Sequence, residues 1–312
     1  METKKAAILP VKSIGDALLL MIGANHLKNL GYDVTILHDN IRSLRNWFPK
    51  FNFKKYSSDA LKNFDHVFVQ NDESKLQKIL FLKEALKNKK LSVLYFRYNK
   101  SKHGPISNLD ITLEEKQPIA ISLANSFQKF LKIENNFSQK LDTGIVIPQG
   151  LIFKKNPKRI ILQPTSGDTK KCWSKKKFIR LAKRLKNLGF HPIISVAPHE
   201  RANWLFVQNL GIDLPLFHTL SEFASYLYES AYLIGNDSFA IHLASLMKID
   251  HIMIAASKKL IKTWQGGWLK SNIILPPSWV PNLKHFRLRE KSFQAFISTR
   301  KVLKVFNSTY SK

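Results

Sequence analysis

The chain contains 312 residues, of which 44% are hydrophobic, and this is typical of about two domains with sizeable cores. No run of about 20 apolar residues occurs, so we expect no transmembrane helix, and the basic start leads into too short an apolar stretch for a signal peptide. The single cysteine, Cys172, excludes an intrachain disulfide and a cysteine metal cluster, and it fits a reducing, cytoplasmic setting.

The charge of the chain is strongly unbalanced. There are 50 Lys and Arg residues against 22 Asp and Glu residues, which gives a formal net charge of +28. Charged residues make up 23% of the chain, close to the usual ~25%, so acidic residues are scarce rather than charge being abundant. Such a surface attracts nucleic acid, an anionic membrane face or phosphorylated glycans. The alternative is a lysine-rich composition on a solvated surface.

The first half alternates between apolar strand-like runs and helical patterns, which predicts a parallel sheet covered by helices. The first helix follows the segment from Lys12 to Asp16 and ends at Gly31. The further expected elements are strands at about 6–10, 34–37, 67–69 and 91–96, and helices at about 74–88 and 119–131.

The same rhythm restarts after a Gly- and Pro-containing linker at 142–158. We expect strands at 159–163, 192–197, 232–234 and 251–256, and helices from Ser174 to Gly189 (with Leu188 on its apolar face), at 201–210 and at 221–229. A basic amphipathic tail covers about 290–306. The sequence therefore predicts an α/β protein of two doubly wound domains, 1–150 and 151–312, facing each other across a cleft.

The segment 232–245 has the pattern of a buried strand, a polar turn and a short helix. Asp237 and Ser238 are preferred N-cap residues, so the helix is expected to begin at one of them. A helix N-terminus favours phosphate, and Ser238 and His242 share the helix face beside it. The alternative is a capped structural helix with a buried histidine, and this stretch alone favours neither.

Two further loops carry candidate functional residues. Asp16 follows Gly15 in the first strand-to-helix turn, where a carboxylate could act as a general base or could serve only as a helix N-cap. The loop 163–173 contains Thr165, Ser166 and Lys171, which fits a diphosphate cradle or a solvated basic loop. After the next strand, Glu200 could accept hydrogen bonds from ribose hydroxyls or could be an ordinary exposed acid.

Several common motifs are absent from the sequence. It contains no G-x-G-x-x-G dinucleotide fingerprint, no P-loop, no H-E-x-x-H and no G-x-S-x-G nucleophile elbow. Redox, nucleotide triphosphatase, zinc protease and esterase functions are therefore disfavoured. No D-x-D acidic pair occurs in a likely site loop, so a metal-bound diphosphate is not favoured either.

Taken together, four motifs resemble glycosyltransferase family 9, the ADP-heptose:lipopolysaccharide heptosyltransferases. They occur in the family's order and are spread over most of the chain: Ser13-Ile14-Gly15-Asp16-Ala17-Leu18-Leu19, Thr165-Ser166 with Lys171-Cys172-Trp173, Pro198-His199-Glu200, and Gly235-Asn236-Asp237-Ser238 with His242-Leu243-Ala244. The resemblance implies the GT-B architecture of two Rossmann-like domains, and an inverting reaction that needs no metal or other cofactor.

The resemblance also implies roles for individual residues. Asp16 matches the general base, with Lys12 and Gly15 beside it as weaker candidates for substrate contact. In the second domain, the residues that match donor-binding positions are Thr165, Ser166, Lys171, Glu200, Asp237, Ser238 and His242. Phe239 is a departure, because the family usually has Gly there, and a bulky ring could reshape the donor pocket.

The predicted function is transfer of a heptose or related sugar from an ADP-linked donor to a lipopolysaccharide core or similar anionic glycolipid. We expect a cytoplasmic, monomeric enzyme with peripheral contact to the anionic inner membrane face, whose tail helix packs toward the first domain. Two alternatives remain open. One is a family member that binds nucleotide sugar or glycan without transferring it, and the other is a basic nucleic-acid-binding protein, although the sequence contains no recognised nucleic-acid-binding motif.

Overall fold

The computed structural model describes residues 3–57, 59–72, 82, 90–114, 117–133, 140–257, 267–281 and 288–310. The chain divides into two compact units, Met1–Pro148 and Gln149–Lys312. The expected helix at 74–88 lies outside the described residues, apart from Leu82, which is buried in the core of the first unit. Within the described residues, no helix has the length and apolar character needed to span a membrane.

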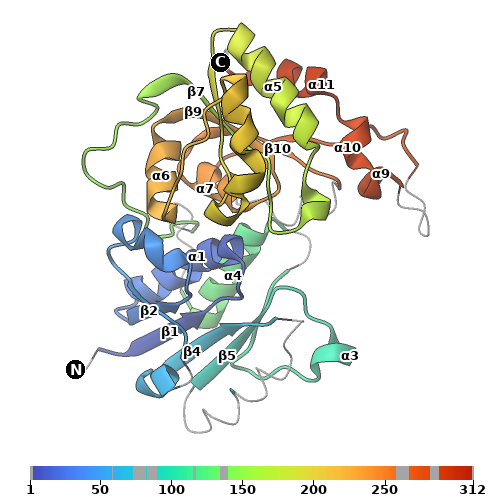
Figure 1. Cartoon of the computed structure of the whole chain (residues 1–312). Coiled ribbons are helices and arrows are strands. Elements are labelled where there is room, and N and C mark those ends of the chain that lie inside the picture. The colour runs from blue at the N-terminus through green and yellow to red at the C-terminus, as the bar shows by residue number, and fades with distance from the viewer. Residues whose placement is uncertain are drawn as a thin grey trace. The chain divides into compact units, whose positions relative to one another are not determined.

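The first unit is built on a parallel sheet in the order β3-β2-β1-β4-β5-β6. Figure 1 labels the central strands β2, β1, β4 and β5 of this sheet. Its strands are β1 (Lys5–Leu9), β2 (Asp33–Leu37), β3 (Asn52–Lys54), β4 (His66–Gln70), β5 (Lys90–Tyr95) and β6 (Ile111–Thr112). The chain leaves β1 in one direction to form β2 and β3, and returns on the other side of β1 to form β4. The gap between β1 and β4 is therefore the switch point, where sheets of this kind bind ligands.

Two helices cover much of the first sheet, α1 (Ile14–Asn29) and α4 (Ile119–Leu131). Twelve of the 16 residues of α1 are buried, because the helix contacts both the sheet and α4. Helix α4 packs on the sheet as well, through Phe127, whose ring lies 5.7 Å from that of Phe68 on β4. The two helices approach closely at Gly23, where a Cβ atom would lie 2.4 Å from the ring of Phe127. Shorter helical turns are η1 (Ile41–Trp47), η2 (Asp59–Asn63) and α3 (Lys100–His103).

His66 should make the first unit sensitive to acid. It is buried at the start of β4, stacks on Phe68 and pairs with the hydroxyl of Ser92 at 2.8 Å. Burial, and then the charge of Lys90, lower the pKa of His66 from 6.5 to about 4. Between these values the unfolded chain binds the proton and the native chain does not. The free energy of unfolding should therefore fall by roughly 3 kcal/mol as the pH drops through this interval.

Urea unfolding at about pH 7 and about pH 4.5 measures this loss. In the His66→Gln variant, the difference in unfolding free energy between the two pH values should be smaller. His218 is exposed, so His218→Gln is the matched control and should retain the wild-type difference. Equal acid sensitivity of wild type and His66→Gln would show that another group is responsible.

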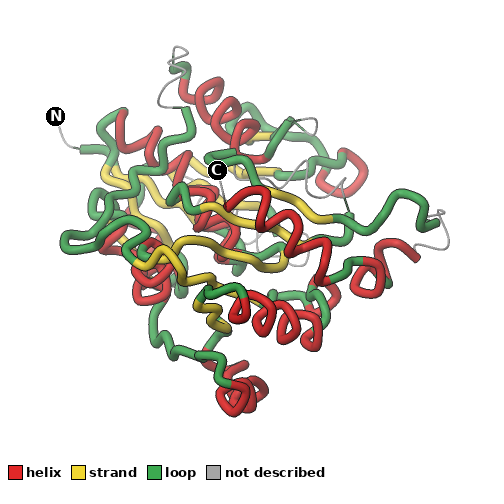
Figure 2. Tube along the Cα trace, turned by 90° about the horizontal axis from the view of Figure 1, so that it is seen from above, coloured by secondary structure: helices red, strands yellow, loops and turns green. Residues whose placement is uncertain are grey.

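The second unit is built on a parallel sheet in the order β11-β10-β9-β7-β8. Its strands are β7 (Asn156–Gln163), β8 (His191–Ile194), β9 (Ser230–Asn236), β10 (Asp250–Ile254) and β11 (Asn272–Ile274). Here the direction of winding reverses between β7 and β9. Figure 2 shows helices in red beside the strands in yellow. The helices of the second unit are η4 (Thr169–Lys171), α5 (Lys175–Asn187), η5 (Pro198–Leu210), α6 (Leu220–Tyr228), α7 (Phe239–Leu246), α9 (Leu288–Lys291), α10 (Phe293–Phe296) and α11 (Thr299–Tyr310).

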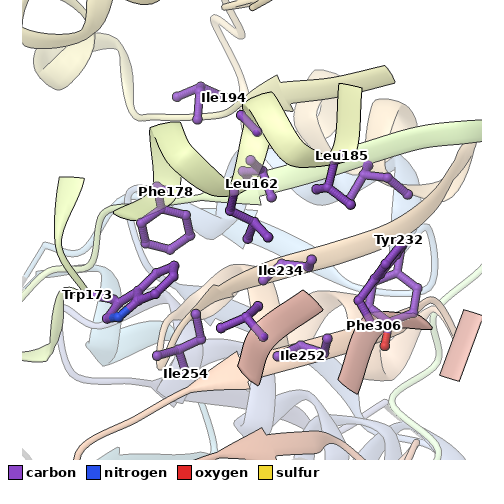
Figure 3. Close-up of a cluster of buried hydrophobic side chains, with 14 of the residues drawn as sticks. Leu162, Trp173, Phe178, Leu185, Ile194, Tyr232, Ile234, Ile252, Ile254 and Phe306 are labelled. Carbon is purple, nitrogen blue, oxygen red and sulfur yellow. The ribbon is translucent and has the colours of Figure 1, made fainter. Parts of the chain in front are cut away.

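The core of the second unit lies between its sheet and helices α5 and α11. Phe178 and Leu185 of α5 meet Leu162 and Ile234 of the central strands (Figure 3). On the same face of the sheet, Phe306 of α11 makes an edge-to-face ring contact with Tyr232 at 5.1 Å. These apolar contacts connect the C-terminal helix to the sheet of its own unit.

Both sheets are parallel, and within the described residues helices connect strands of each sheet, as α1 does between β1 and β2 and α5 between β7 and β8. The predicted α/β, doubly wound fold class is therefore confirmed. Several details differ from the prediction. The short strands β3, β6 and β11 were missed, and the helix expected at 201–210 is the 3₁₀ helix η5. Leu188 was expected on the apolar face of α5, but it follows the last turn of the helix and is 52% exposed.

The tail also differs from the prediction. Instead of one helix at 290–306, it contains the three short helices α9, α10 and α11. The buried side of α11 packs on the sheet of the second unit. Packing of the tail toward the first domain stays a prediction.

Candidate active site

The turn after β1 carries Asp16, at the switch point of the first sheet. Helix α1 begins at Ile14, and its N-cap is Ser13, whose hydroxyl accepts from the backbone N–H of Asp16 at 3.5 Å. Asp16 is therefore the third residue of the helix and not its cap, so the N-cap interpretation of this residue is wrong. Its carboxylate is half-buried in the first helical turn, where the helix dipole favours negative charge.

Gln70, the last residue of β4, holds the Asp16 side chain from across the switch point. Its amide Nε2 donates to Oδ1 of Asp16 at 3.0 Å, and its Oε1 accepts from the backbone N–H of Val11 at 3.1 Å. Gln70 is only 5% exposed, so water offers this amide little competition. One hydrogen bond orients the carboxylate, and the second connects Gln70 to the same turn.

His38, at the end of β2, supports the turn from the opposite side of β1. Its Nδ1 accepts from the backbone N–H groups of Asn40 and Ile41, each at 3.2 Å, so the proton lies on Nε2. Nε2 then donates to the backbone oxygen of Lys12 at 3.2 Å. Burial lowers the pKa of His38 and keeps the ring neutral. The side chain of Lys12 is exposed, whereas Gly15 is buried.

At the switch point of the second sheet, β7 and β9 are joined by a close backbone approach and by a buried amide. A Cβ atom on Gly235 would lie 2.9 Å from that of Gln163, so the neighbouring strand leaves room only for glycine. Asn236 is fully buried, and its side chain accepts from the N–H of Trp173 at 2.8 Å and donates to the oxygen of Pro164 at 2.7 Å. The loops after β7 and β9 are therefore fixed to each other.

Lys171, Asp237 and Ser166 meet where these two loops converge. The ammonium of Lys171 lies 3.0 Å from Oδ2 of Asp237, and the hydroxyl of Ser166 donates to the backbone oxygen of Asp237 at 3.0 Å. The Lys171 side chain is about half exposed, at 47%. An ammonium has three N–H donors, so two of them remain for a ligand oxygen after the bond to Asp237.

Helix α7 begins beside this cluster, at Phe239. Ser238 occupies the N-cap position, but its side chain makes no cap bond and its Oγ atom is buried. The expected cap by Asp237 or Ser238 is therefore not formed by either side chain, because that of Asp237 is paired with Lys171. The half-buried Phe239 is the first helical residue, and His242 lies one turn further along the helix, 8% exposed.

The remaining candidates have structural contacts of their own. The Thr165 hydroxyl accepts from the side chain of Gln163 at 3.3 Å. Oε2 of Glu200 accepts from the N–H of Ala197 at 3.1 Å, so this acid stabilises the start of η5 with one of its two oxygens. Burial, and then the carboxylates of Glu200 and Asp168, raise the pKa of the Cys172 thiol.

The structure thus brings Ser166, Lys171 and Asp237 into one cluster at the start of α7. The sequence did not predict a role for Gln70, for His38 or for Asn236, although Asn236 belongs to one of the four motifs. A polar side chain directly at the end of a buried strand is the signal that could have identified all three. Among the residues that the structure describes, no three His, Cys, Asp or Glu side chains form a group able to hold a metal ion.

No family model matches the sequence, and no curated protein matches it. Solved structures of glycosyltransferases are nevertheless similar to it over nearly their whole length. Escherichia coli heptosyltransferase WaaC with ADP has a TM-score of 0.70 at 13% identity, and the match covers 97% of this chain and 99% of that one.

Two further structures give the same result. E. coli ADP-heptose lipopolysaccharide heptosyltransferase II has a TM-score of 0.68 at 13% identity and 98% coverage of both chains. The family 9 glycosyl transferase of Veillonella parvula has a TM-score of 0.62 at 15% identity, with 100% of this chain and 99% of that one covered. The chain therefore has the GT-B fold of the heptosyltransferases and of glycosyltransferase family 9.

Proposed function

We propose that this protein is an inverting glycosyltransferase that moves a heptose or related sugar from an ADP-linked donor to an anionic glycolipid such as a lipopolysaccharide core. The observation that carries the proposal is the cluster of Lys171, Asp237 and Ser166 at the start of α7. The proposal is also supported by the similarity of the fold to heptosyltransferase structures, by the four motifs of one family and by the basic composition.

The cluster has the chemistry that a nucleotide diphosphate requires. Lys171 supplies a positive charge, and the N-terminus of α7 adds backbone N–H donors and the positive end of the helix dipole. The buried Oγ of Ser238 lies at the same terminus. Donors arranged in advance around a departing diphosphate stabilise the charge that develops as the bond to the sugar breaks.

Asp16 is proposed as the general base. Oδ1 is held by Gln70, which leaves Oδ2 to accept the proton of an acceptor hydroxyl. The acceptor oxygen then forms a bond to the anomeric carbon from the face opposite the diphosphate. The bond between that carbon and the diphosphate oxygen breaks, and its electron pair leaves with the nucleotide. The configuration at the anomeric carbon is inverted, and no metal is required by these steps.

The proposal extends to the setting of the enzyme. The net charge of +28 suits a monomeric, cytoplasmic protein that meets an acidic glycolipid at an anionic membrane face. The ring of Phe239 at the first position of α7 supports the alternative of a protein that binds nucleotide sugar without transferring it. Donor binding without turnover on a broad set of acceptors would favour that alternative.

Thermal unfolding in the presence of ADP, ADP-heptose, UDP, GDP, CMP and NAD tests the donor site. A ligand that binds only the folded protein adds about 2.7 kcal/mol of stability at 100 times its Kd, so the unfolding midpoint rises. We expect this rise with ADP and ADP-heptose, and we expect Lys171→Ala to abolish it. The unliganded midpoint of the variant must be measured as well, since Asp237 loses its partner.

Lys170→Ala is the matched control, because Lys170 is an exposed lysine in the same 3₁₀ turn. It should respond to ADP as the wild type does. A shift with UDP or GDP alone would support a transferase that uses a UDP- or GDP-linked donor in place of an ADP-linked one. If none of the nucleotides moves the midpoint, the assignment of this cluster to a donor is wrong.

A further inference from the structure

Helix α5 presents a dense positive charge on its outer side. Seven of its 13 residues are Lys or Arg and none is acidic. Phe178 and Leu185 point toward the sheet (Figure 3), so the basic residues occupy the rest of the helix surface. Lys176, Arg180 and Lys183 are exposed, and their spacing of four and three residues places them on one face.

The 3₁₀ helix η5 lies alongside α5, because two lysines of α5 connect the two elements at both ends. Lys175 donates to the backbone oxygen of Asn203, and its ammonium lies 4.6 Å from the centre of the Phe206 ring. Eleven residues further along α5, Lys186 donates to the backbone oxygen of Gly211 at 2.9 Å. The two elements therefore lie next to each other on the second unit.

Three large apolar side chains of η5 are exposed to solvent. Leu205 is 49% exposed, Phe206 is 41% exposed and Leu210 is 38% exposed. Phe206 lies beside Lys175, and Leu210 precedes Gly211, whose backbone oxygen accepts from Lys186. Isolated exposed leucines are ordinary, but three large apolar residues within six positions beside a basic helix are not.

We propose that this α5–η5 surface, made of Lys176, Arg180 and Lys183 with Leu205, Phe206 and Leu210, docks on a membrane that contains anionic lipids. Within the described residues, none of the three basic side chains forms an ion pair, so their charges are available to lipid headgroups. Each such charge near an anionic bilayer contributes about a factor of five in affinity, and apolar side chains insert between the headgroups.

The apolar side chains favour a membrane over nucleic acid. The phosphate groups of a nucleic-acid duplex are bound by basic and polar residues, and contacts with exposed leucines would add little to the free energy of binding. At a bilayer, the same leucines leave water while the lysines remain at the headgroups. The proposal does not depend on sugar transfer, since the surface contains none of the residues assigned to the donor cluster or to the base.

Co-sedimentation of the full chain with vesicles tests the proposal. We expect binding to vesicles of phosphatidylglycerol and phosphatidylcholine, and little binding to pure phosphatidylcholine. Reversal of the three charges (Lys176→Glu, Arg180→Glu, Lys183→Glu) should weaken binding to the anionic vesicles about 100-fold or more. The double variant Leu205→Ser, Phe206→Ser should bind less well than wild type at high salt, where the electrostatic contribution is screened.

The matched control makes the same change of charge in the first unit, at the exposed residues Lys50, Lys54 and Lys55. It should retain most of the binding. An equal loss in the control would show that net charge alone directs the protein to lipid and would overturn the assignment of the surface. A wild type that ignores anionic vesicles but binds duplex DNA, with that binding lost in the α5 variant, would overturn it in favour of nucleic acid.

Discussion

The Asp16→Asn variant should lose sugar transfer by about 100- to 10,000-fold, which is the usual contribution of a general base. The substitution keeps the size and shape of the side chain, so Gln70 can still contact it from β4. An amide cannot accept the proton of the acceptor hydroxyl, and kcat should fall for this reason. Donor binding, measured as the thermal shift with ADP, should stay at the wild-type value because Asp16 lies in the other unit from Lys171.

Asp39→Asn is the matched control for this experiment. Asp39 is an exposed acid that follows β2, and like Asp16 it acts electrostatically on His38. The same loss of one negative charge at this position should leave kcat near the wild-type value. Turnover of Asp16→Asn within a few-fold of wild type would contradict the assignment of the base.

The Gln70→Leu variant should lower kcat by roughly 100-fold, because a misplaced reacting group is costly even when it is chemically intact. Gln70 is a positioning residue here, since it acts through its hydrogen bond to Asp16. Removal of the amide frees the carboxylate to rotate and leaves the N–H of Val11 without its acceptor. The KM for the donor should change little, because Gln70 belongs to the first sheet.

Gln128→Leu separates positioning from a general loss of stability. Gln128 is equally buried, 5% exposed, but it lies on α4. Its replacement should leave kcat unchanged. Gln70→Glu provides a second readout, because it puts another carboxylate next to Asp16. Repulsion between the two should move the acidic limb of the pH–rate profile to higher pH. If the profile does not move and Gln128→Leu is as slow as Gln70→Leu, Gln70 has only a structural role.

Local patterns in the sequence were enough to predict the repeating order of strands and helices. The helix at 119–131 was predicted with the bounds it has, because its apolar spacing is regular and Pro118 precedes it. Strands β3, β6 and β11 were missed because each contains only two or three residues at a sheet edge, too few for a pattern. The glycine at position 31 correctly marked the end of α1, since it adopts a positive φ of 84°.

The cap assignments show where local reasoning fails. Asp16, Asp237 and Ser238 all belong to residue types that favour N-caps, yet none of their side chains makes a cap bond. Asp16 is bound by Gln70, which lies 54 residues away, and Asp237 is bound by Lys171, which lies 66 residues away. Propensity describes what a residue does with its neighbours in the chain, and here distant partners bind the carboxylates of Asp16 and Asp237 instead.

The sequence by itself determined the fold class, the two-part organisation and the residue types of the candidate site, because periodicity and composition are local properties of the chain. Tertiary structure alone decided which strands lie side by side, and therefore that Gln70 holds Asp16 and that Asn236 joins the loops after β7 and β9. The physical reason is that parallel strand order depends on contacts between segments far apart in sequence, which no local pattern encodes.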